Sequence, residues 1–407
     1  MKIAGIVAEY NPFHNGHAHH IERTRAADGL CRATHVVAVM SGNFVQRGEP
    51  ALLPKADRVR AALAGGVDLV LELPLPWAIA SAESFAFGAV AILDALGCVD
   101  VLSFGSECGD IAPLKKAADA LLSERFAVLL RYHLAGGISF PEARQRAAEE
   151  LIGKKAASVL DSANNTLGVE YLKALRRLGS SIRPFTIPRL GAGHDGPLPV
   201  GDMASASFLR GLLTAGRIAN AAPYIPPVPL EILYDAARAG RCPATAERID
   251  RAMLSALRRL SKEQIARLPG ISEGLENRIY EAIRNSGSMP ELENAVKTKR
   301  YPLTRIRRIL LAGFLGLSAG WETRKPPYIR VLGVGEKGAE ILKAAKGASL
   351  PLVTRVSQLE AFPEDARRLF ALEARAADLY ALALPTPLAC GTEYTNGMIR
   401  WGDATRS

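Results

Sequence analysis

The chain has 407 residues, of which 48% are hydrophobic, and this is enough to bury the cores of two or three domains. Its 51 Lys and Arg outnumber 41 Asp and Glu, and the net charge of +10 favours a polyanionic partner, although surplus charge also serves solubility. Five scattered cysteines without a C-x-x-C pair argue against a disulfide scaffold or a zinc framework and predict reduced thiols.

The sequence predicts a cytoplasmic protein without membrane contact. Glu9 and Asn11 interrupt the first apolar run, so the N-terminus lacks the organisation of a signal peptide. The apolar stretch from Ile309 to Trp321 is too short to cross a bilayer. No protein partner is inferred.

A buried strand and a histidine-bearing turn open the chain. Ile3 to Val7 is an uninterrupted apolar run, which predicts a strand buried on both faces. The turn His14-Asn15-Gly16-His17 follows, and a helical pattern begins near His20. Free backbone N–H groups and the helix dipole favour an anion at such a helix start. Two imidazoles there suit phosphate chemistry on a nucleotide, although the turn alone also fits a surface loop or half of a metal site.

Strands and helices then alternate, which predicts a doubly wound, parallel sheet with right-handed crossovers. Loops at the carboxyl ends of its strands are expected to build the site. After the second strand, Arg47 and Lys55 are candidates for phosphate contact, with a solvated helix start as the equally weighted alternative for Lys55. The predicted strands are residues 3–7, 34–40, 67–73, 99–104 and 181–187, with a long helix at 77–96 and helical pattern over 111–160.

Later loops supply further candidates for nucleotide contact. Gly105 would let a nucleotide approach the backbone closely, and Glu107 is either a ribose ligand or a plain loop carboxylate. Asn164 and Asn165 precede a helix, where an amide can bond an adenine edge or ribose, or only cap the helix. Residues 204–210 begin another helix, and its first turns carry serine hydroxyls and an arginine.

The character of the chain changes after residue 221. Residues 221–229 are rich in proline and predict a linker that continues neither helix nor sheet. Residues 244–317 have a helical pattern, and between residues 251 and 310 thirteen Lys and Arg stand against six Glu and no Asp. This concentration favours RNA over a merely solvated helical face. Its densest part, the basic segment (residues 297–308), carries six cations and no acid: Lys297, Lys299, Arg300, Arg305, Arg307 and Arg308.

Residues 328–334 predict a last strand. The following Gly333 to Gly338 spells G-x-G-x-x-G, which we interpret as a tight strand-to-helix turn because no long βαβ repeat follows. The tail after Gly391 indicates no chemistry. The predicted domains are a nucleotide-binding catalytic α/β domain (1–221), a basic helical domain (230–322) and a small C-terminal α/β region (323–407).

Two short stretches carry a resemblance to known proteins. The first motif (residues 10–17, YNPFHNGH) resembles the H/T-x-G-H signature of the nucleotidyltransferase superfamily. The second motif (residues 204–210, ASASFLR) resembles that superfamily's I-S-S/G-T-x-x-R signature, with Ala206 and Ser207 as mild departures. The longer strings at residues 5–20, 40–58 and 104–110 are similar to one family, the bacterial tRNA(Met) cytidine acetate ligases.

The resemblance implies a fold and an activity. The N-terminal domain is expected to have the HIGH-type nucleotidyltransferase fold and to use ATP with Mg²⁺, without a permanently bound cofactor. Acetate would be activated as acetyl-adenylate and transferred, without acetyl-coenzyme A, to N4 of the wobble cytidine (C34) of elongator tRNA(Met). Two alternatives stay open: a small-molecule adenylyltransferase for cofactor synthesis, which leaves the basic helical domain unexplained, and a non-enzymatic RNA-binding protein with a degenerate nucleotide site.

The resemblance also implies site residues. Phosphate charge is expected to be stabilised by His14, His17, Arg47 and Arg210, with no metal ligand and no general base assigned. Asn165 is preferred to Asn164 as an ATP contact, and the basic segment is expected to bind tRNA. The expected ATP contacts are Val7, Ala8, Glu9, Tyr10, Asn11, Phe13, His14, Gly16, His17, His20, Gly105, Asn164, Asn165, Arg189, Leu190, Ser205, Ser207 and Arg210.

Overall fold

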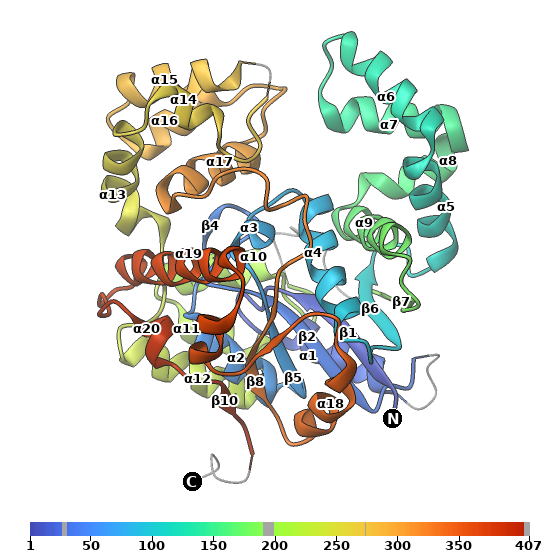
Figure 1. Ribbon diagram of the computed structural model, residues 1–407, viewed down its shortest axis with the longest axis vertical. Coiled ribbons are helices and arrows are strands. Elements are labelled where there is room, and N and C mark those ends of the chain that lie inside the picture. Colours follow the sequence, from blue (N-terminus) through green and yellow to red (C-terminus); the bar gives the residue numbers. More distant parts are fainter. Residues whose placement is uncertain (27–30, 190–198, 273, 403–407) are drawn as a thin grey trace.

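A central sheet with helices on both faces organises the computed structural model, which describes residues 1–26, 31–189, 199–272 and 274–402 (Figure 1). Its strands lie in the order β10-β8-β5-β2-β1-β6-β7, with β9 beside β8, and a separate hairpin pairs β3 with β4. The strands are β1 (Ile3–Ala8), β2 (His35–Ser41), β3 (Phe44–Val45), β4 (Glu49–Pro50), β5 (Leu69–Leu73), β6 (Val101–Ser106), β7 (Arg183–Pro188), β8 (Ile329–Val334), β9 (Leu352–Val353) and β10 (Ile399–Arg400).

The first five long strands form the predicted parallel sheet. β1 pairs with β2 from Ile3↔His35 to Ala8↔Met40 and with β6 on its other edge. β5 extends the sheet beyond β2, and β7 extends it beyond β6, all in parallel. Because the chain moves outward from β1 in both directions, β1 lies at a switch point, where open α/β sheets bind ligands at the carboxyl ends of their strands. The predicted fold class is confirmed.

Alternate residues of the central strands enter different cores, so the middle of the sheet is buried on both faces. In β2, Val37 and Val39 join one core, while Val36 and Ala38 join the other. One face is covered by α3 (Leu75–Ala78), α4 (Ala82–Ala95) and α9 (Ala163–Leu178), and the other by α1 (Asn15–Arg25), α2 (Lys55–Ala64) and α12 (Pro227–Arg238).

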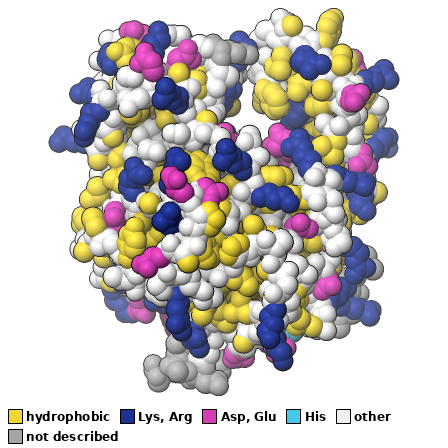
Figure 2. Space-filling model, viewed as in Figure 1, with side chains coloured by type: hydrophobic (Ala, Val, Ile, Leu, Met, Phe, Trp, Pro, Cys, Tyr) yellow, Lys and Arg dark blue, Asp and Glu magenta, His cyan; other side chains and the backbone are white. Residues whose placement is uncertain are grey.

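Two helical lobes stand on the same side of the sheet (Figure 1). The space-filling view shows an opening between them and Lys and Arg side chains on both (Figure 2). Within the described ranges, each helix is too short or too polar to cross a bilayer. One lobe comprises α5 (Ile111–Leu122), α6 (Glu124–Ala135), α7 (Phe140–Ile152) and α8 (Lys154–Ala157). The other comprises α13 (Ala246–Arg258), α14 (Lys262–Ala266), α15 (Leu275–Asn285), α16 (Met289–Val296) and α17 (Leu303–Leu315).

Two local predictions were wrong. The expected helix over 77–96 is divided, because Ser81 adopts an extended conformation and its side chain accepts a hydrogen bond from the N–H of Ser84, which starts α4 anew. The proline-rich stretch 221–229 is not an unstructured linker. It follows α10 (Ala206–Thr214) and α11 (Ile218–Ala221), and Pro227 begins α12, since proline is well tolerated in a first helical turn.

The C-terminal region completes the sheet. β8 lies antiparallel to β5, and β10 lies parallel to β8, so residues 329–334 and 399–400 share a sheet with residues 3–8. The predicted boundaries 1–221, 230–322 and 323–407 remain a prediction. The G-x-G-x-x-G stretch is the expected tight turn: Gly338 opens α18 (Gly338–Ala344), and its N–H donates to the carbonyl of Gly335. Helices α19 (Glu364–Tyr380) and α20 (Thr392–Thr395) lie between β9 and β10 in the chain.

Candidate active site

A cavity of about 280 Å³ lies at the carboxyl ends of β1, β6 and β7, where the switch point predicts a ligand site. Both motifs contribute to it, together with Arg47 from the β3–β4 hairpin. The lining residues are Ile6, Val7, Ala8, Glu9, Tyr10, Asn11, His14, Gly16, His17, His19, His20, Gln46, Arg47, Phe85, Phe104, Gly105, Asn164, Leu167, Tyr171, Ile187, Pro188, Arg189, Met203, Ala206, Ser207 and Arg210.

The two histidines of the first motif cap helix α1. Nδ1 of His14 accepts the backbone N–H of Gly16 at 3.0 Å, and Nδ1 of His17 accepts the backbone N–H of His14 at 3.3 Å. A ring nitrogen that accepts a hydrogen bond carries no proton, so each neutral ring has its N–H at Nε2. The ring centroids of His14 and His17 lie 3.8 Å apart. The capping geometry therefore fixes the tautomer and leaves the Nε2 edges as hydrogen-bond donors.

These imidazoles are neutral in the folded protein. Burial, helped by the charges of Arg189 and Arg210, lowers the pKa of His14 to about 3. Burial and the neighbouring His14 lower the pKa of His17 well below its ordinary value. For His20, burial and Arg189 lower the pKa to about 4, and its Nε2 lies 3.0 Å from Oγ of Ser103. The rings thus suit donation to phosphate oxygens rather than charge pairing.

The two motifs are bonded to each other. Nη1 of Arg210 donates to the backbone carbonyl of Asn11 at 3.1 Å, and Nη2 donates to Oγ of Ser207 at 3.0 Å. Oγ of Ser205 caps α10 by accepting the N–H of Phe208 at 3.2 Å. A helix start carrying an arginine therefore faces the histidine turn across one small cavity, which is a setting for an anion.

The β3–β4 hairpin and the carboxyl end of β1 form another part of the cavity wall. Oε1 of Glu9 accepts the backbone N–H of Gln46 at 2.8 Å, which fixes the hairpin beside β1. Burial raises the pKa of Glu9. The next residue, Arg47, lines the cavity and adds a cationic side chain.

The two asparagines before α9 have different roles. Nδ2 of Asn164 donates to Oε1 of Glu107 at 2.6 Å, while its Oδ1 accepts Nη1 of Arg189 at 3.3 Å. Oδ1 of Asn165 accepts the backbone N–H groups of Glu107 and Cys108, at 2.9 and 3.1 Å. Asn164 lines the cavity, whereas Asn165 is buried and holds the loop after β6. Glu107 uses its carboxylate to accept the N–H groups that start α9.

Most predicted ATP contacts meet at this cavity. Phe13, Asn165 and Ser205 lie outside its lining, so Asn164 rather than the preferred Asn165 faces the cavity. The centroids of the Phe13 and His17 rings lie 5.5 Å apart, and the Ser205 side chain caps α10. Leu190 lies outside the described residues. Sequence reasoning missed the apolar wall of Phe85, Phe104, Leu167 and Tyr171, although Phe104 stands next to the predicted Gly105 at a strand end.

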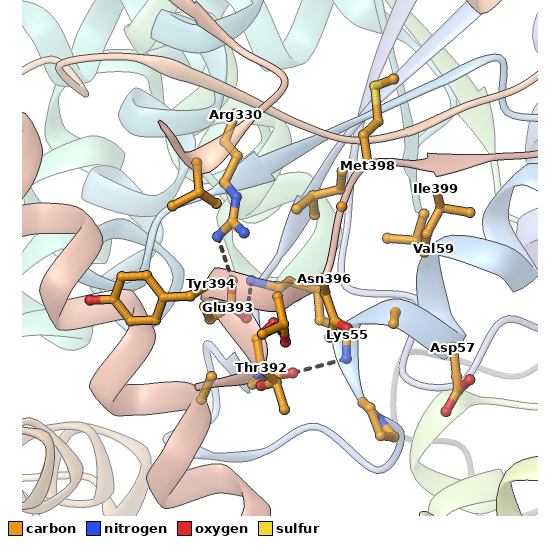
Figure 3. Close-up of a pocket in the computed structure, with 18 of the residues that line it drawn as sticks. Lys55, Asp57, Val59, Arg330, Thr392, Glu393, Tyr394, Asn396, Met398 and Ile399 are labelled. Carbon is orange, nitrogen blue, oxygen red and sulfur yellow. Dashed lines mark hydrogen bonds and ion pairs between the residues drawn. The ribbon is translucent and has the colours of Figure 1, made fainter. Parts of the chain in front are cut away.

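Lys55 lies outside the cavity lining and is buried. It is therefore neither the predicted phosphate contact nor the alternative, a solvated residue at a helix start. Its Nζ lies 2.5 Å from Glu72 and 2.8 Å from Glu393, and Arg330 pairs with the same two carboxylates. Figure 3 shows Lys55 and Arg330 on either side of Glu393. Burial works against the charge of Lys55, but these carboxylates prevail and its pKa is raised. Glu373 lies beside this group, and burial and Glu72 raise its pKa to about 8. The cluster borders a cavity of about 910 Å³, larger than the one at the strand ends, but its charges are already paired.

The basic segment divides into two groups. Lys297, Lys299 and Arg300 are exposed. By contrast, Arg307 forms a bidentate ion pair with Glu293, and Nη1 of Arg308 donates to the backbone carbonyl of Gln46 at 3.4 Å. Nη2 of Arg305 donates to Gly270 and Ser272, at 2.8 and 2.7 Å. The second group is committed to protein contacts, and Arg308 joins the helical lobe to the hairpin at the cavity.

A HIGH-type nucleotidyltransferase is the class of protein that this fold and cavity define. A family model described as HIGH Nucleotidyl Transferase matches residues 1–393. The tRNA(Met) cytidine acetate ligase of Thermoanaerobacter sp. (strain X514) is 40% identical over 406 residues, covering 98% of this chain and 100% of the relative. Crystal structures of Thermotoga maritima TmcAL, apo and bound with alpha-thio ATP, align with TM-scores of 0.93 and 0.91 at 36% and 34% identity, each covering 98% of this chain and 100% of the solved chain.

The chain therefore belongs to the HIGH nucleotidyl transferase family and, within it, to the tRNA(Met) cytidine acetate ligases. The family resemblance seen in the two motifs is confirmed over nearly the whole chain.

Proposed function

We propose that the protein is an ATP-dependent ligase that activates acetate as acetyl-adenylate and acetylates N4 of the wobble cytidine of elongator tRNA(Met). The observation that supports it most is the Arg210–Asn11 hydrogen bond, which joins both nucleotidyltransferase motifs around one cavity. The names of the relatives and the ATP analogue bound by the Thermotoga maritima protein support the nucleotide and the acceptor.

The cavity's chemistry suggests how a triphosphate would lie. The Nε2–H groups of His14 and His17 would donate to phosphate oxygens, while Arg210 and Arg47 would supply positive charge. The adenine would lie against the apolar wall of Phe104 and Tyr171. This arrangement places donors where negative charge develops as the α-phosphorus is attacked.

The first half-reaction would follow from this placement. A carboxylate oxygen of acetate attacks the α-phosphorus, a new P–O bond forms, and the bond to the bridging oxygen of pyrophosphate breaks. No general base is needed, because acetate is already an anion. Before ATP binds, burial lowers the pKa values of both imidazoles, so they enter the reaction as neutral donors.

Mg²⁺ would be carried by the triphosphate. Among the residues that the structure describes, no group of three His, Cys, Asp or Glu is placed to hold a metal ion, and Mg²⁺ in nucleotide sites takes most of its ligands from phosphate and water. When bound, it would neutralise charge on the leaving pyrophosphate.

The tRNA would approach along the exposed cations Lys297, Lys299 and Arg300, which can pair with backbone phosphates. A tRNA substrate implies a cytoplasmic location, and the described cysteines, which form no disulfide, fit a reducing compartment.

Nucleoside mass spectrometry tests this proposal. The protein is incubated with ATP, Mg²⁺, isotope-labelled acetate and an elongator tRNA(Met) transcript, and we expect labelled N4-acetylcytidine at the wobble position. Acetyl-coenzyme A without ATP should give none, and a transcript with uridine at that position serves as the matched control. Unmodified tRNA together with ATP-dependent adenylation of another acid would overturn the assignment.

A further inference from the structure

Another cavity, of about 560 Å³, adjoins the cavity at the strand ends. The cavity at the strand ends is called the first cavity below, and this one the second cavity. It lies between the β4 and α10 side of the catalytic region and helices α13, α16 and α17 of the helical lobe. Among the described residues, Arg210 alone lines both cavities.

Helix α10 runs from the first cavity to the second. Ser207 and Arg210 line the first cavity, and Arg210, Gly211 and Thr214 line the second. Spacings of three and four residues place all four positions on one helical face. The two cavities therefore meet at Arg210.

The β3–β4 hairpin also lines both cavities. Gln46 and Arg47 line the first cavity, and Gly48 and Glu49 line the second. At the junction, Oε1 of Glu49 lies 3.8 Å from Nε of Arg210. An acyl group formed beside Arg210 would thus be reached from the second cavity, with a carboxylate next to it.

The second cavity has an apolar floor, and its charged lining is mixed: four carboxylates, of Glu49, Glu247, Asp250 and Glu293, stand beside three arginines. Leu52, Leu310 and Leu311 are buried there. Among the carboxylates, Glu293 forms a bidentate ion pair with Arg307, while Glu49 lies at the junction with the first cavity. An apolar floor suits a planar base, and carboxylates are the natural acceptors for the exocyclic amine of cytosine.

The cavity is also joined to the exposed cations. Its residues Met289 and Glu293 lie on α16, and the segment with Lys297, Lys299 and Arg300 follows the end of that helix. Eight residues of helix span about 12 Å. An RNA loop held on those cations would therefore have the cavity within its immediate neighbourhood.

We propose that this second cavity receives the acceptor cytosine, extruded from its RNA loop, and that Glu49 accepts a proton from its N4 amine. This rests on the proposed function. N4 attacks the acyl carbon, a C–N bond forms, and the C–O bond to the adenylate phosphate breaks with its electron pair leaving on AMP. The proton lost from N4 passes to Glu49. Extrusion is the general solution when an enzyme must act on a base edge.

Filling the cavity tests the proposal. Thr214 is exposed on α10 and lines only the second cavity, so Thr214→Trp should place a ring there without disturbing a core. Acetate-dependent ATP–pyrophosphate exchange should stay within twofold of the parent, while tRNA acetylation should fall more than tenfold. Ala215→Trp, one position on and outside both linings, is the matched control and should retain both activities.

The junction carboxylate gives a second test. Glu49→Gln should slow single-turnover acetyl transfer from preformed acetyl-adenylate on the order of 10²-fold, and Glu49→Asp should recover part of that loss. Parent-like tRNA acetylation by Thr214→Trp would overturn the proposal, as would simultaneous loss of exchange and acetylation, which would make the cavity an extension of the ATP site. Should the parent itself leave tRNA unmodified, the proposed function fails instead, so the two failures are distinguishable.

Discussion

Arg210 is the side chain on which the two motifs depend, so its removal gives the sharpest test of the site. Arg210→Gln deletes the donors to Asn11 and Ser207 and a positive charge facing the cavity. Hydrogen bonds from charged groups contribute about 1.5–3 kcal/mol each. One such bond to the reacting phosphates corresponds to a fall of roughly 10- to 150-fold in kcat/KM for ATP. Acetate-dependent ATP–pyrophosphate exchange without tRNA measures this directly.

Two variants separate catalysis from folding. Arg217→Gln removes an exposed arginine just beyond the same helix and should leave exchange unchanged. Arg210→Lys keeps the charge but loses the planar fork, so it should fall between the parent and Arg210→Gln. Urea unfolding should show whether the Gln variant remains folded. A folded Arg210→Gln protein with exchange within twofold of the parent would refute the reasoning.

Three further predictions concern pH, burial and charge. The pKa of His14 is lowered to about 3 and that of His20 to about 4, so the unfolded chain binds more protons than the folded protein below pH 6.5. The unfolding free energy should therefore fall by about 1.4 kcal/mol per pH unit per histidine between pH 6.5 and 4. A urea midpoint that stays constant across that range would contradict this. Glu393→Gln removes a carboxylate partner from the buried cations Lys55 and Arg330, and should lower the unfolding free energy by about 3–5 kcal/mol. A loss below 1 kcal/mol in urea unfolding would contradict this account of the buried charges. Arg300→Gln should weaken tRNA binding and lower the slope of log binding constant against log salt concentration by about one, measured by filter binding. Arg308→Gln should instead raise KM for ATP several-fold in the exchange assay, because it releases the carbonyl of Gln46. The reverse pattern would contradict the division of the basic segment into two groups.

The features that sequence predicted well depend on neighbours in the chain. The strand Ile3–Ala8, the histidine turn and the cap at Ser205 are specified within a few residues by apolar runs, glycine and hydroxyl side chains. Their meeting at one cavity follows from the switch point of a parallel sheet, which alternation of strands and helices also predicts.

The features that sequence missed depend on distant pairings. Nothing near Lys55 indicates that Glu393, more than 300 positions away, neutralises it, and the tail that carries Glu393 has no local signal. The six cations of the basic segment look alike in sequence, but only the fold shows that Arg308 reaches the carbonyl of Gln46. Asn164 and Asn165 differ in the same way, since their neighbours across the loop decide which one faces the cavity.

Transfer of oxygen from acetate to AMP tests the central claim most directly. Acetate labelled with ¹⁸O in both oxygens is incubated with the protein, ATP and elongator tRNA(Met), and the products are analysed by mass spectrometry. If acetate attacks the phosphorus held between the two motifs and the cytosine then displaces the adenylate, one ¹⁸O appears in AMP and the other stays in the acetylated nucleoside. Label in inorganic phosphate, or unlabelled AMP, would contradict the account.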